Sequence, residues 1–159
     1  MLTPESLLRE AEKRLAAAGI ENPREAAYLF EHVFGMKHYD PRIELNEDKT
    51  ADFAALIDRR VEGIPYQYLI GKAPFLDIDL YCGEGVLIPR PDTETLVEIA
   101  AKECEKNGLK RVVDLCSGTG CIGIGVKRSV PDSDVTCVEK SEEAYRYLAK
   151  NCEIGRAHV

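Results

Sequence analysis

The sequence predicts an α/β protein in which a small N-terminal helical bundle and a β-hairpin linker precede the first part of a Rossmann-like parallel sheet. Apolar residues recur with helical spacing over residues 1–63, and an alternating stretch with turn signals follows. Two later apolar segments are each followed by a helical pattern, an order typical of parallel sheets. We therefore expect a helical domain at 1–63, a hairpin linker at 64–92 and a partial α/β domain at 93–153.

The first domain carries the start and stop signals of several amphipathic helices. Threonine or asparagine precedes proline at two of the expected starts, and glycine follows the last apolar residue of each pattern. The expected limits are Thr3 to Gly19, Asn22 to Gly35 and Thr50 to Glu62, with a further short helix around 42–45. Because this bundle holds no cluster of catalytic residue types, we interpret it as a recognition domain.

The linker reads as a pair of strands. Residues 76–82 alternate between apolar and polar side chains, which indicates a half-buried strand. Gly83-Glu-Gly85 is a turn signal, and residues 86–88 are expected to return as the partner strand. A helix is then expected from about Thr93 to Lys106, because its apolar residues recur with helical spacing.

A glycine-rich loop after the next apolar segment predicts a nucleoside cofactor site. Residues 112–115 read as a strand, and Gly118-Thr-Gly120-Cys-Ile-Gly123 opens a helix with the dinucleotide pattern G-x-G-x-x-G. In a dinucleotide site the strand normally runs straight into the first glycine. Here three residues separate Asp114 from Gly118, an arrangement that favours an S-adenosylmethionine site over a nicotinamide dinucleotide site. A tight strand–helix turn without a ligand is the third alternative.

The second strand of the expected sheet ends in a carboxylate. Residues 135–138 are followed by Glu139, and Ser141 then caps a last helix. A carboxylate at this point can accept hydrogen bonds from both hydroxyls of a ribose. Both cofactor classes use such an acid, so Glu139 supports nucleoside binding without choosing between them.

Composition excludes several classes of function. The net charge is −7 and no basic patch is present, which argues against a direct nucleic-acid partner. No apolar run approaches the roughly 20 residues needed to cross a bilayer, and the N-terminus lacks a secretory signal, so we expect a cytoplasmic protein without a membrane partner. The six cysteines form no C-x-x-C pair and the three histidines are scattered, so no metal site is expected.

Three motifs, taken in order, resemble the peptide chain release factor N(5)-glutamine methyltransferases, the PrmC/HemK family. They follow the helical domain and are spaced as in that family. The motifs are Pro65-Tyr-Gln-Tyr-Leu-Ile-Gly71, Leu87-Ile-Pro-Arg-Pro-Asp-Thr-Glu94 and Val113-Asp-Leu-Cys-Ser-Gly-Thr-Gly120. The resemblance covers residues 1–152 and implies that 93–153 is part of a class I methyltransferase domain that binds S-adenosyl-L-methionine.

The resemblance also implies roles for individual residues. Asp114 would shape the loop, the following backbone would wrap the methionine part of the cofactor, and Glu139 would hold the ribose. The implied cofactor-binding residues are Asp114, Cys116, Ser117, Gly118, Thr119, Gly120 and Glu139. The family usually has glycine at the position of Cys116, and we expect this cysteine to adopt an ordinary φ angle.

The implied reaction is transfer of a methyl group from a sulfonium to a glutamine side-chain amide of a release factor. In the family, an Asn-Pro-Pro-Tyr segment grips that amide, and this sequence contains no Asn-Pro-Pro. We therefore assign no catalytic residue and expect a C-terminally truncated, inactive fragment whose residues after Gly108 bury few apolar side chains. Residues 154–159 read like a translated sequencing adapter, so we expect a non-native tail.

Two other functions remain open from the sequence alone. The first is an amino-methyltransferase acting on nucleic acid or on another protein, because related sites use similar Pro-Pro motifs. The second is a non-catalytic module in which the helical bundle docks a partner. A downstream segment with Asn-Pro-Pro-Tyr would exclude the second alternative.

Overall fold

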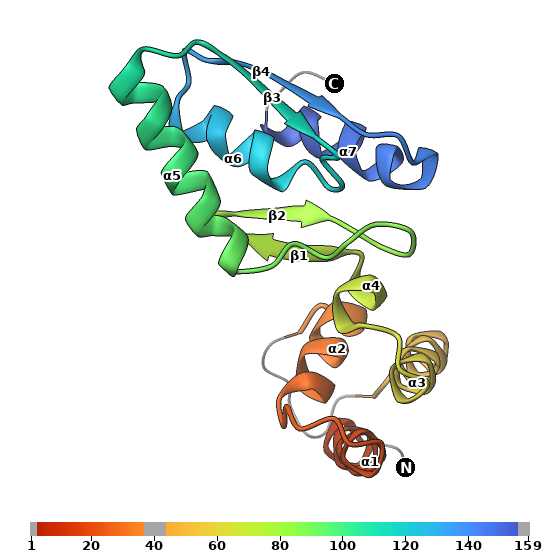
Figure 1. The fold of residues 1–159 in the computed structure, drawn as a ribbon. Coiled ribbons are helices and arrows are strands. Elements are labelled where there is room, and N and C mark those ends of the chain that lie inside the picture. The colour runs from red at the N-terminus through yellow and green to blue at the C-terminus, as the bar shows by residue number, and fades with distance from the viewer. Residues whose placement is uncertain (1–2, 37–43, 156–159) are drawn as a thin grey trace. The chain divides into compact units, whose positions relative to one another are not determined.

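The computed structural model describes residues 3–36 and 44–155, and the chain divides into two compact units, Met1–Ile70 and Gly71–Val159. The first unit is helical and the second combines helices with strands (Figure 1). This division and the mixed content confirm the predicted fold class, an α/β protein that begins with a helical bundle.

The helices of the first unit follow the predicted pattern, with shifted starts. The elements are α1 (Pro4–Ala17), α2 (Glu25–Phe34), α3 (Glu47–Val61) and α4 (Tyr66–Ile70). Thr3 caps α1 as expected, but Asn46 rather than Thr50 marks the start of α3, because its side chain accepts from Lys49 N at 3.0 Å. Asn22 instead accepts from Arg24 N at 3.1 Å and closes the turn before α2. The helix predicted around 42–45 falls partly outside the described residues, and residues 44–46 are not helical.

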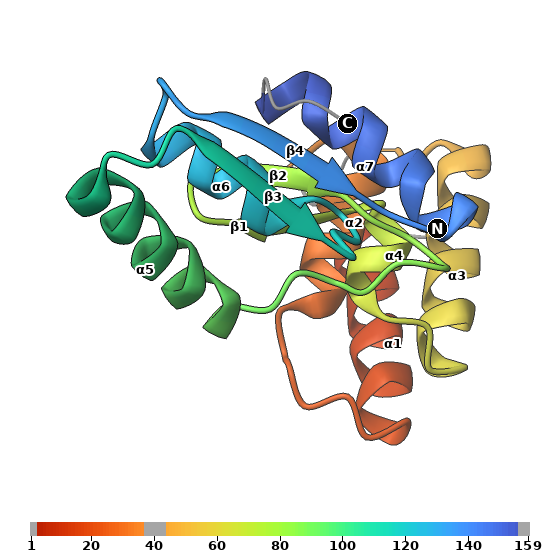
Figure 2. The ribbon, with the colours of Figure 1, turned by 45° about the horizontal axis from the view of Figure 1, so that its top comes forward.

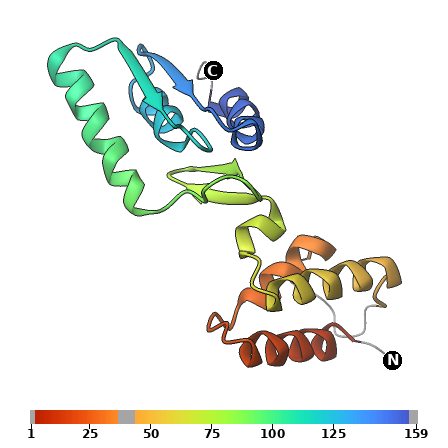
Figure 3. The same ribbon diagram turned by 45° about the vertical axis from the view of Figure 1, so that its right-hand side comes forward.

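The core of the first unit is aromatic. Phe30 stacks on Phe34 with ring centroids 4.3 Å apart, and Phe53 meets Phe30 edge-on at 5.8 Å. These rings join α2 to α3, while α1 packs against both helices (Figure 3). A buried ion pair between Glu25 and Arg60 adds a polar link between α2 and α3.

The hairpin of the second unit forms from different residues than predicted. Strand β1 (Lys72–Phe75) pairs antiparallel with β2 (Ile78–Tyr81), so residues 76 and 77 make the turn. The predicted return strand at 86–88 is wrong, because those residues form no strand. The alternation at 76–82 belongs to β2, whose partner lies upstream: Ala73 and Phe75 bury their side chains and supply the second apolar row.

A parallel sheet and its helices complete the second unit. Strand β3 (Arg111–Leu115) runs parallel to β4 (Asp134–Val138), as Figure 2 shows. Asp114 lies opposite Cys137 in this pairing. The helices are α5 (Asp92–Asn107), α6 (Cys121–Ser129) and α7 (Glu142–Gly155). Figures 1 and 3 show α6 and α7 lying between this sheet and the β1–β2 hairpin. The unit therefore has three layers: parallel sheet, helices and hairpin.

This layering corrects the expectation that few apolar residues after Gly108 are buried. Ile124, Val126, Val135 and Leu148 are fully buried, because α6 and α7 are covered by the sheet on one side and by the hairpin on the other. The opposite face of the sheet differs. Val113 and Leu115 are 61% and 69% exposed there, so among the described residues this face has no covering layer.

None of the helices within the described ranges has the length and apolar character needed to cross a membrane.

Candidate cofactor site

The glycine-rich loop and Glu139 lie at the same edge of the parallel sheet. The loop follows the carboxyl end of β3, and Glu139 follows the carboxyl end of β4. In open α/β sheets, ligands bind in the crevice outside these strand ends. The fold therefore brings together the two features that the sequence assigned to one site.

Ser117 ties the start of the loop to β4. Its hydroxyl donates to Asp114 O at 2.8 Å and accepts from Val138 N at 2.9 Å, while Ser117 N donates to Val138 O at 3.1 Å. The side chain is buried by these contacts. Ser117 thus extends the pairing of the two strands by one residue and fixes where the loop leaves the sheet.

Asp114 connects the end of β3 to the first turn of α6. One carboxylate oxygen accepts from Gly123 N at 2.9 Å. Burial raises the pKa of Asp114, and the hydrogen bond from Gly123 opposes this shift only in part. Gly123 allows the close approach, because a Cβ there would lie 2.4 Å from Cys137 Sγ and 3.2 Å from Asp114 Oδ2. The end of β3, the first turn of α6 and β4 therefore contact one another at Gly123.

The loop backbone has an unusual conformation at Cys116. Its φ angle is +59°, so the expectation of an ordinary φ at this position is wrong. The chain must turn sharply after β3 to reach Ser117, and this turn requires the left-handed region that suits glycine. Gly118 and Gly120 have φ angles of +57° and +79° in the same loop. The Cys116 side chain is exposed, at the outer surface of the loop.

Glu139 is held by backbone N–H groups from two directions. Its carboxylate accepts from Gly118 N at 2.8 Å, from Lys140 N at 2.8 Å and from Ser141 N at 2.9 Å. The bonds from Ser141 and Gly118 hold the pKa of Glu139 below its usual range. A carboxylate offers about four acceptor positions, so a further hydroxyl donor can still be accommodated. Glu139 is thus an ionised, half-buried acceptor joined directly to the loop.

Thr119 and Asn151 complete the inner side of the loop. Thr119 is buried, and its carbonyl accepts from Asn151 Nδ2 at 2.9 Å. The sequence reasoning assigned no role to Asn151. A signal was present, because residue 151 falls on the apolar stripe of α7 formed by Ala144, Leu148 and Cys152. A polar residue on such a stripe must find hydrogen-bond partners in the core.

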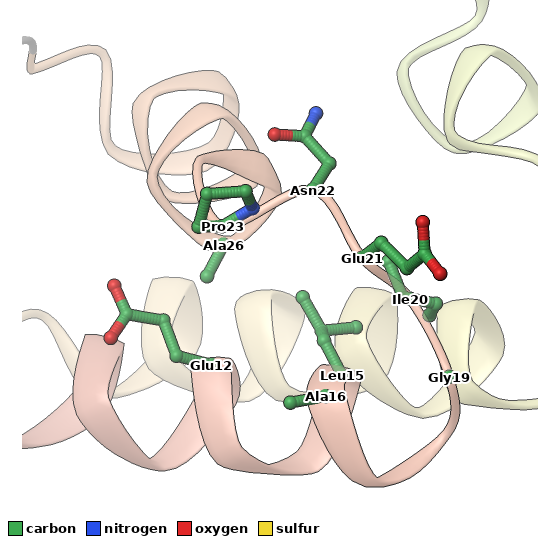
Figure 4. Close-up of a pocket in the computed structure, with 9 residues that line it drawn as sticks. All are labelled: Glu12, Leu15, Ala16, Gly19, Ile20, Glu21, Asn22, Pro23 and Ala26. Carbon is green, nitrogen blue, oxygen red and sulfur yellow. The ribbon is translucent and has the colours of Figure 1, made fainter.

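The first unit contains a separate hollow, of about 420 Å³. Its floor is formed by apolar side chains of α1, of α2 and of the turn between them, with Leu15 pointing upward into it (Figure 4). The lining residues are Glu12, Leu15, Ala16, Gly19, Ile20, Glu21, Asn22, Pro23 and Ala26. Glu12 and Glu21 are exposed and add negative charge to its edge.

A parallel β-α-β-α segment with a glycine-rich loop, and an acid directly after its second strand, defines the class of protein as one with a Rossmann-like, nucleoside-binding type of fold. Comparison with protein-family models narrows this class to the methyltransferases. Residues 6–71 match the PrmC N-terminal domain, and residues 91–158 match the methyltransferase small domain.

Three similar proteins, from different bacteria, are each named release factor glutamine methyltransferase. The protein from Bifidobacterium longum is 38% identical over 155 residues, covering 91% of this chain and 53% of the relative. The one from Thermodesulfovibrio yellowstonii is 36% identical over 135 residues, covering 82% and 48%, and the one from Deinococcus radiodurans is 32% identical over 158 residues, covering 96% and 57%. The chain belongs to the release factor glutamine methyltransferase family, and it spans about half the length of the curated relatives it matches.

Proposed function

We propose that the second unit binds S-adenosyl-L-methionine through the loop 116–120 and Glu139. The bond between Gly118 N and the Glu139 carboxylate, at 2.8 Å, is the observation on which this proposal chiefly rests. It joins the glycine-rich loop to the acid on the neighbouring strand, so that both can contact one nucleoside. The proposed site residues, whether they touch the cofactor or hold the loop, are those named from the sequence: Asp114, Cys116, Ser117, Gly118, Thr119, Gly120 and Glu139.

The chemistry of these residues fits that cofactor. The ionised Glu139 carboxylate accepts three backbone N–H groups and remains partly open to solvent, so a ribose hydroxyl can donate to its remaining acceptor position. Glycines at 118 and 120 keep side chains away from the loop backbone, so a ligand can approach its peptide groups closely. The buried Ser117 and Thr119 would act from behind, by fixing the loop rather than by touching the ligand.

We propose that the whole protein methylates a glutamine side-chain amide of a peptide chain release factor. When bound, S-adenosylmethionine supplies a methyl group on a positively charged sulfur. An amide nitrogen is a weak nucleophile, so positioning of the two partners would dominate catalysis. This chain would contribute by holding the methyl donor.

The helical unit is the proposed docking site for the protein substrate. Its hollow between α1 and α2 combines an apolar floor with two exposed carboxylates, which suits an apolar side chain flanked by a cationic one. The match of residues 6–71 to the PrmC N-terminal domain supports a role in the same reaction.

Amide NMR on the isotope-labelled chain tests the cofactor proposal and detects weak binding. S-adenosylmethionine should shift the amide signals of Gly118, Gly120 and Ser141 in a saturable manner, and NAD⁺ should not. Glu139→Gln should weaken binding about tenfold through loss of charged acceptors. Glu98→Gln, on the exposed surface of α5, is the matched control and should leave binding unchanged. Shifts of the loop with NAD⁺ alone would overturn the proposal.

The same sample tests the substrate proposal. Addition of an unmodified release factor should shift signals around Ile20 and Ala26, and duplex DNA should leave them in place. Shifts produced by DNA and not by the release factor would favour the alternative of an amino-methyltransferase acting on nucleic acid.

A further inference from the structure

The side chain of Asn151 is fully buried and joins three elements of the second unit. Its Oδ1 accepts from Tyr81 N at 2.7 Å, and its Nδ2 donates to Tyr81 O at 2.9 Å and to Thr119 O at 2.9 Å. Asn151 lies in α7, Tyr81 ends β2, and Thr119 lies in the glycine-rich loop. One amide group therefore links a helix, the hairpin and the candidate cofactor site.

The two hydrogen bonds between the Asn151 side chain and the Tyr81 backbone have the pattern of a pair of residues in neighbouring strands. One acceptor and one donor of Asn151 meet the N–H and the C=O of the same residue, as the backbone of a neighbouring strand residue would. The second hydrogen of Nδ2 remains for Thr119 O. The site therefore uses both amide hydrogens and the oxygen, and an aspartate, which has no donor when ionised, cannot replace the asparagine.

The bond to Thr119 acts between the two glycines of the loop, where no neighbouring side chain restricts the backbone. Thr119 stands between Gly118 and Gly120, both of which have positive φ angles and no side chain to restrict them. Gly118 N in turn donates to Glu139. Fixing the carbonyl of Thr119 therefore limits the freedom of the peptide groups next to the proposed ribose acceptor.

We propose that Asn151 is a positioning residue that holds the loop 116–120 in its ligand-binding shape and couples that shape to the hairpin. This inference rests on the proposed function of the loop, and it goes beyond it by assigning a residue that would not touch the cofactor. Displacement of β2 would reach the loop through Asn151, because the same amide binds both segments.

Asn151→Asp is the most informative substitution. At pH 7 the ionised carboxylate can still accept from Tyr81 N, but it faces the carbonyls of Tyr81 and Thr119 without a proton to donate. In the cofactor-free chain, the amides of Gly118 and Gly120 should exchange with solvent about tenfold faster than in the wild type, and affinity for S-adenosylmethionine should fall about tenfold. Lowering the pH to about 5 should reverse part of both effects, because burial raises the pKa of the new carboxyl group and its neutral form donates one hydrogen bond.

Val97→Ala is the control for a general loss of stability. Val97 is fully buried in the same unit, on α5, and its truncation removes packing without changing a hydrogen bond to the loop. Both variants are compared at a temperature where each is more than about nine-tenths folded. The inference is overturned if Val97→Ala accelerates loop exchange as much as Asn151→Asp does, or if the Asn151→Asp effect does not depend on pH.

The two proposals fail in different ways. Absence of cofactor binding in the wild-type chain, together with fast, pH-dependent loop exchange in Asn151→Asp, would reject the proposed function and retain the role of Asn151. Normal cofactor binding by Asn151→Asp at pH 7 would reject the role of Asn151 and leave the proposed function standing.

Discussion

Replacement of Cys116 by glycine should stabilise the second unit. Cys116 is one of the non-glycine residues with a positive φ angle, at +59°, and its side chain is exposed. The substitution therefore removes backbone strain while giving up little packing. It also restores the residue that the resemblance to the methyltransferase family leads one to expect at this point of the loop.

The magnitude follows from two opposing contributions. A left-handed conformation costs a residue with a Cβ roughly 1–2 kcal/mol. Glycine also lowers the free energy of unfolding by about 0.4–1 kcal/mol, because it adds conformational freedom to the unfolded chain. We therefore expect Cys116→Gly to raise the free energy of unfolding by about 0.5–1 kcal/mol.

Two further variants isolate the backbone contribution. Cys116→Ala removes the thiol but keeps the Cβ, so it should match the wild type in stability. Gly108 has a φ angle of +63°, and an added Cβ there would meet no other described atom within 4 Å. Gly108→Ala should consequently lose the same 0.5–1 kcal/mol or so that Cys116→Gly gains.

Urea unfolding under reducing conditions, followed by the amide signals of β3 and β4, measures the second unit specifically. The reasoning is refuted if Cys116→Gly is no more stable than Cys116→Ala while Gly108→Ala is clearly destabilised. That outcome would mean that the loop relaxes around residue 116 and that its positive φ angle carries no strain.

Three other changes test the remaining contacts. Gly120→Ala should cost about 1–3 kcal/mol more than Gly108→Ala in urea unfolding. Both positions have a positive φ angle, but only the Cβ at 120 would overlap a buried side chain, at 2.5 Å from Leu148 Cδ1. Glu139→Gln should reduce the free energy of unfolding at pH 7, because the pKa of Glu139 in the folded state is lowered. The difference from the wild type should persist above 4.5, the ordinary pKa of a glutamate, and disappear as the pH falls through the lowered pKa. Unfolding measured between about pH 7 and 3 follows this change. Arg60→Ala should destabilise the first unit by about 2–3 kcal/mol in thermal unfolding, because the buried Glu25 loses its ion-pair partner. The 19% exposure of the Arg60 side chain limits the size of this loss. A loss no larger than that of Arg9→Ala, at an exposed position, would contradict the prediction.

The sequence predicted the features that depend on local chemistry. Thr3 caps α1 and Gly35 ends α2 in the left-handed region, each as the residue type requires. The strand before the glycine-rich loop and the strand before Glu139 were both found by their short apolar runs. Their parallel pairing followed from the intervening helix alone, since a parallel connection needs such a crossover.

Features that depend on distant partners were missed or misplaced. The strand at 78–81 could pair with a segment on either side, and only the burial of Ala73 and Phe75 against the helices selects the upstream one. The positive φ of Cys116 reflects the path from β3 to the bond between Ser117 and Val138, 21 residues later in the chain. The three bonds of Asn151 likewise join residues separated by 70 and 32 positions.

The two faces of the parallel sheet have different consequences for the candidate site. The face that α6 and α7 cover contains Asp114 and Cys137, and these residues set the close approach of Gly123. The other face presents Val113 and Leu115 to solvent and supplies none of the hydrogen bonds described for the loop. Parallel sheets are normally covered on both faces, so the exposed face lowers the stability of the sheet. The loop geometry nevertheless depends on contacts from the covered face, from α7 and from the hairpin, which explains why the loop is held by hydrogen bonds although one face of the sheet is exposed.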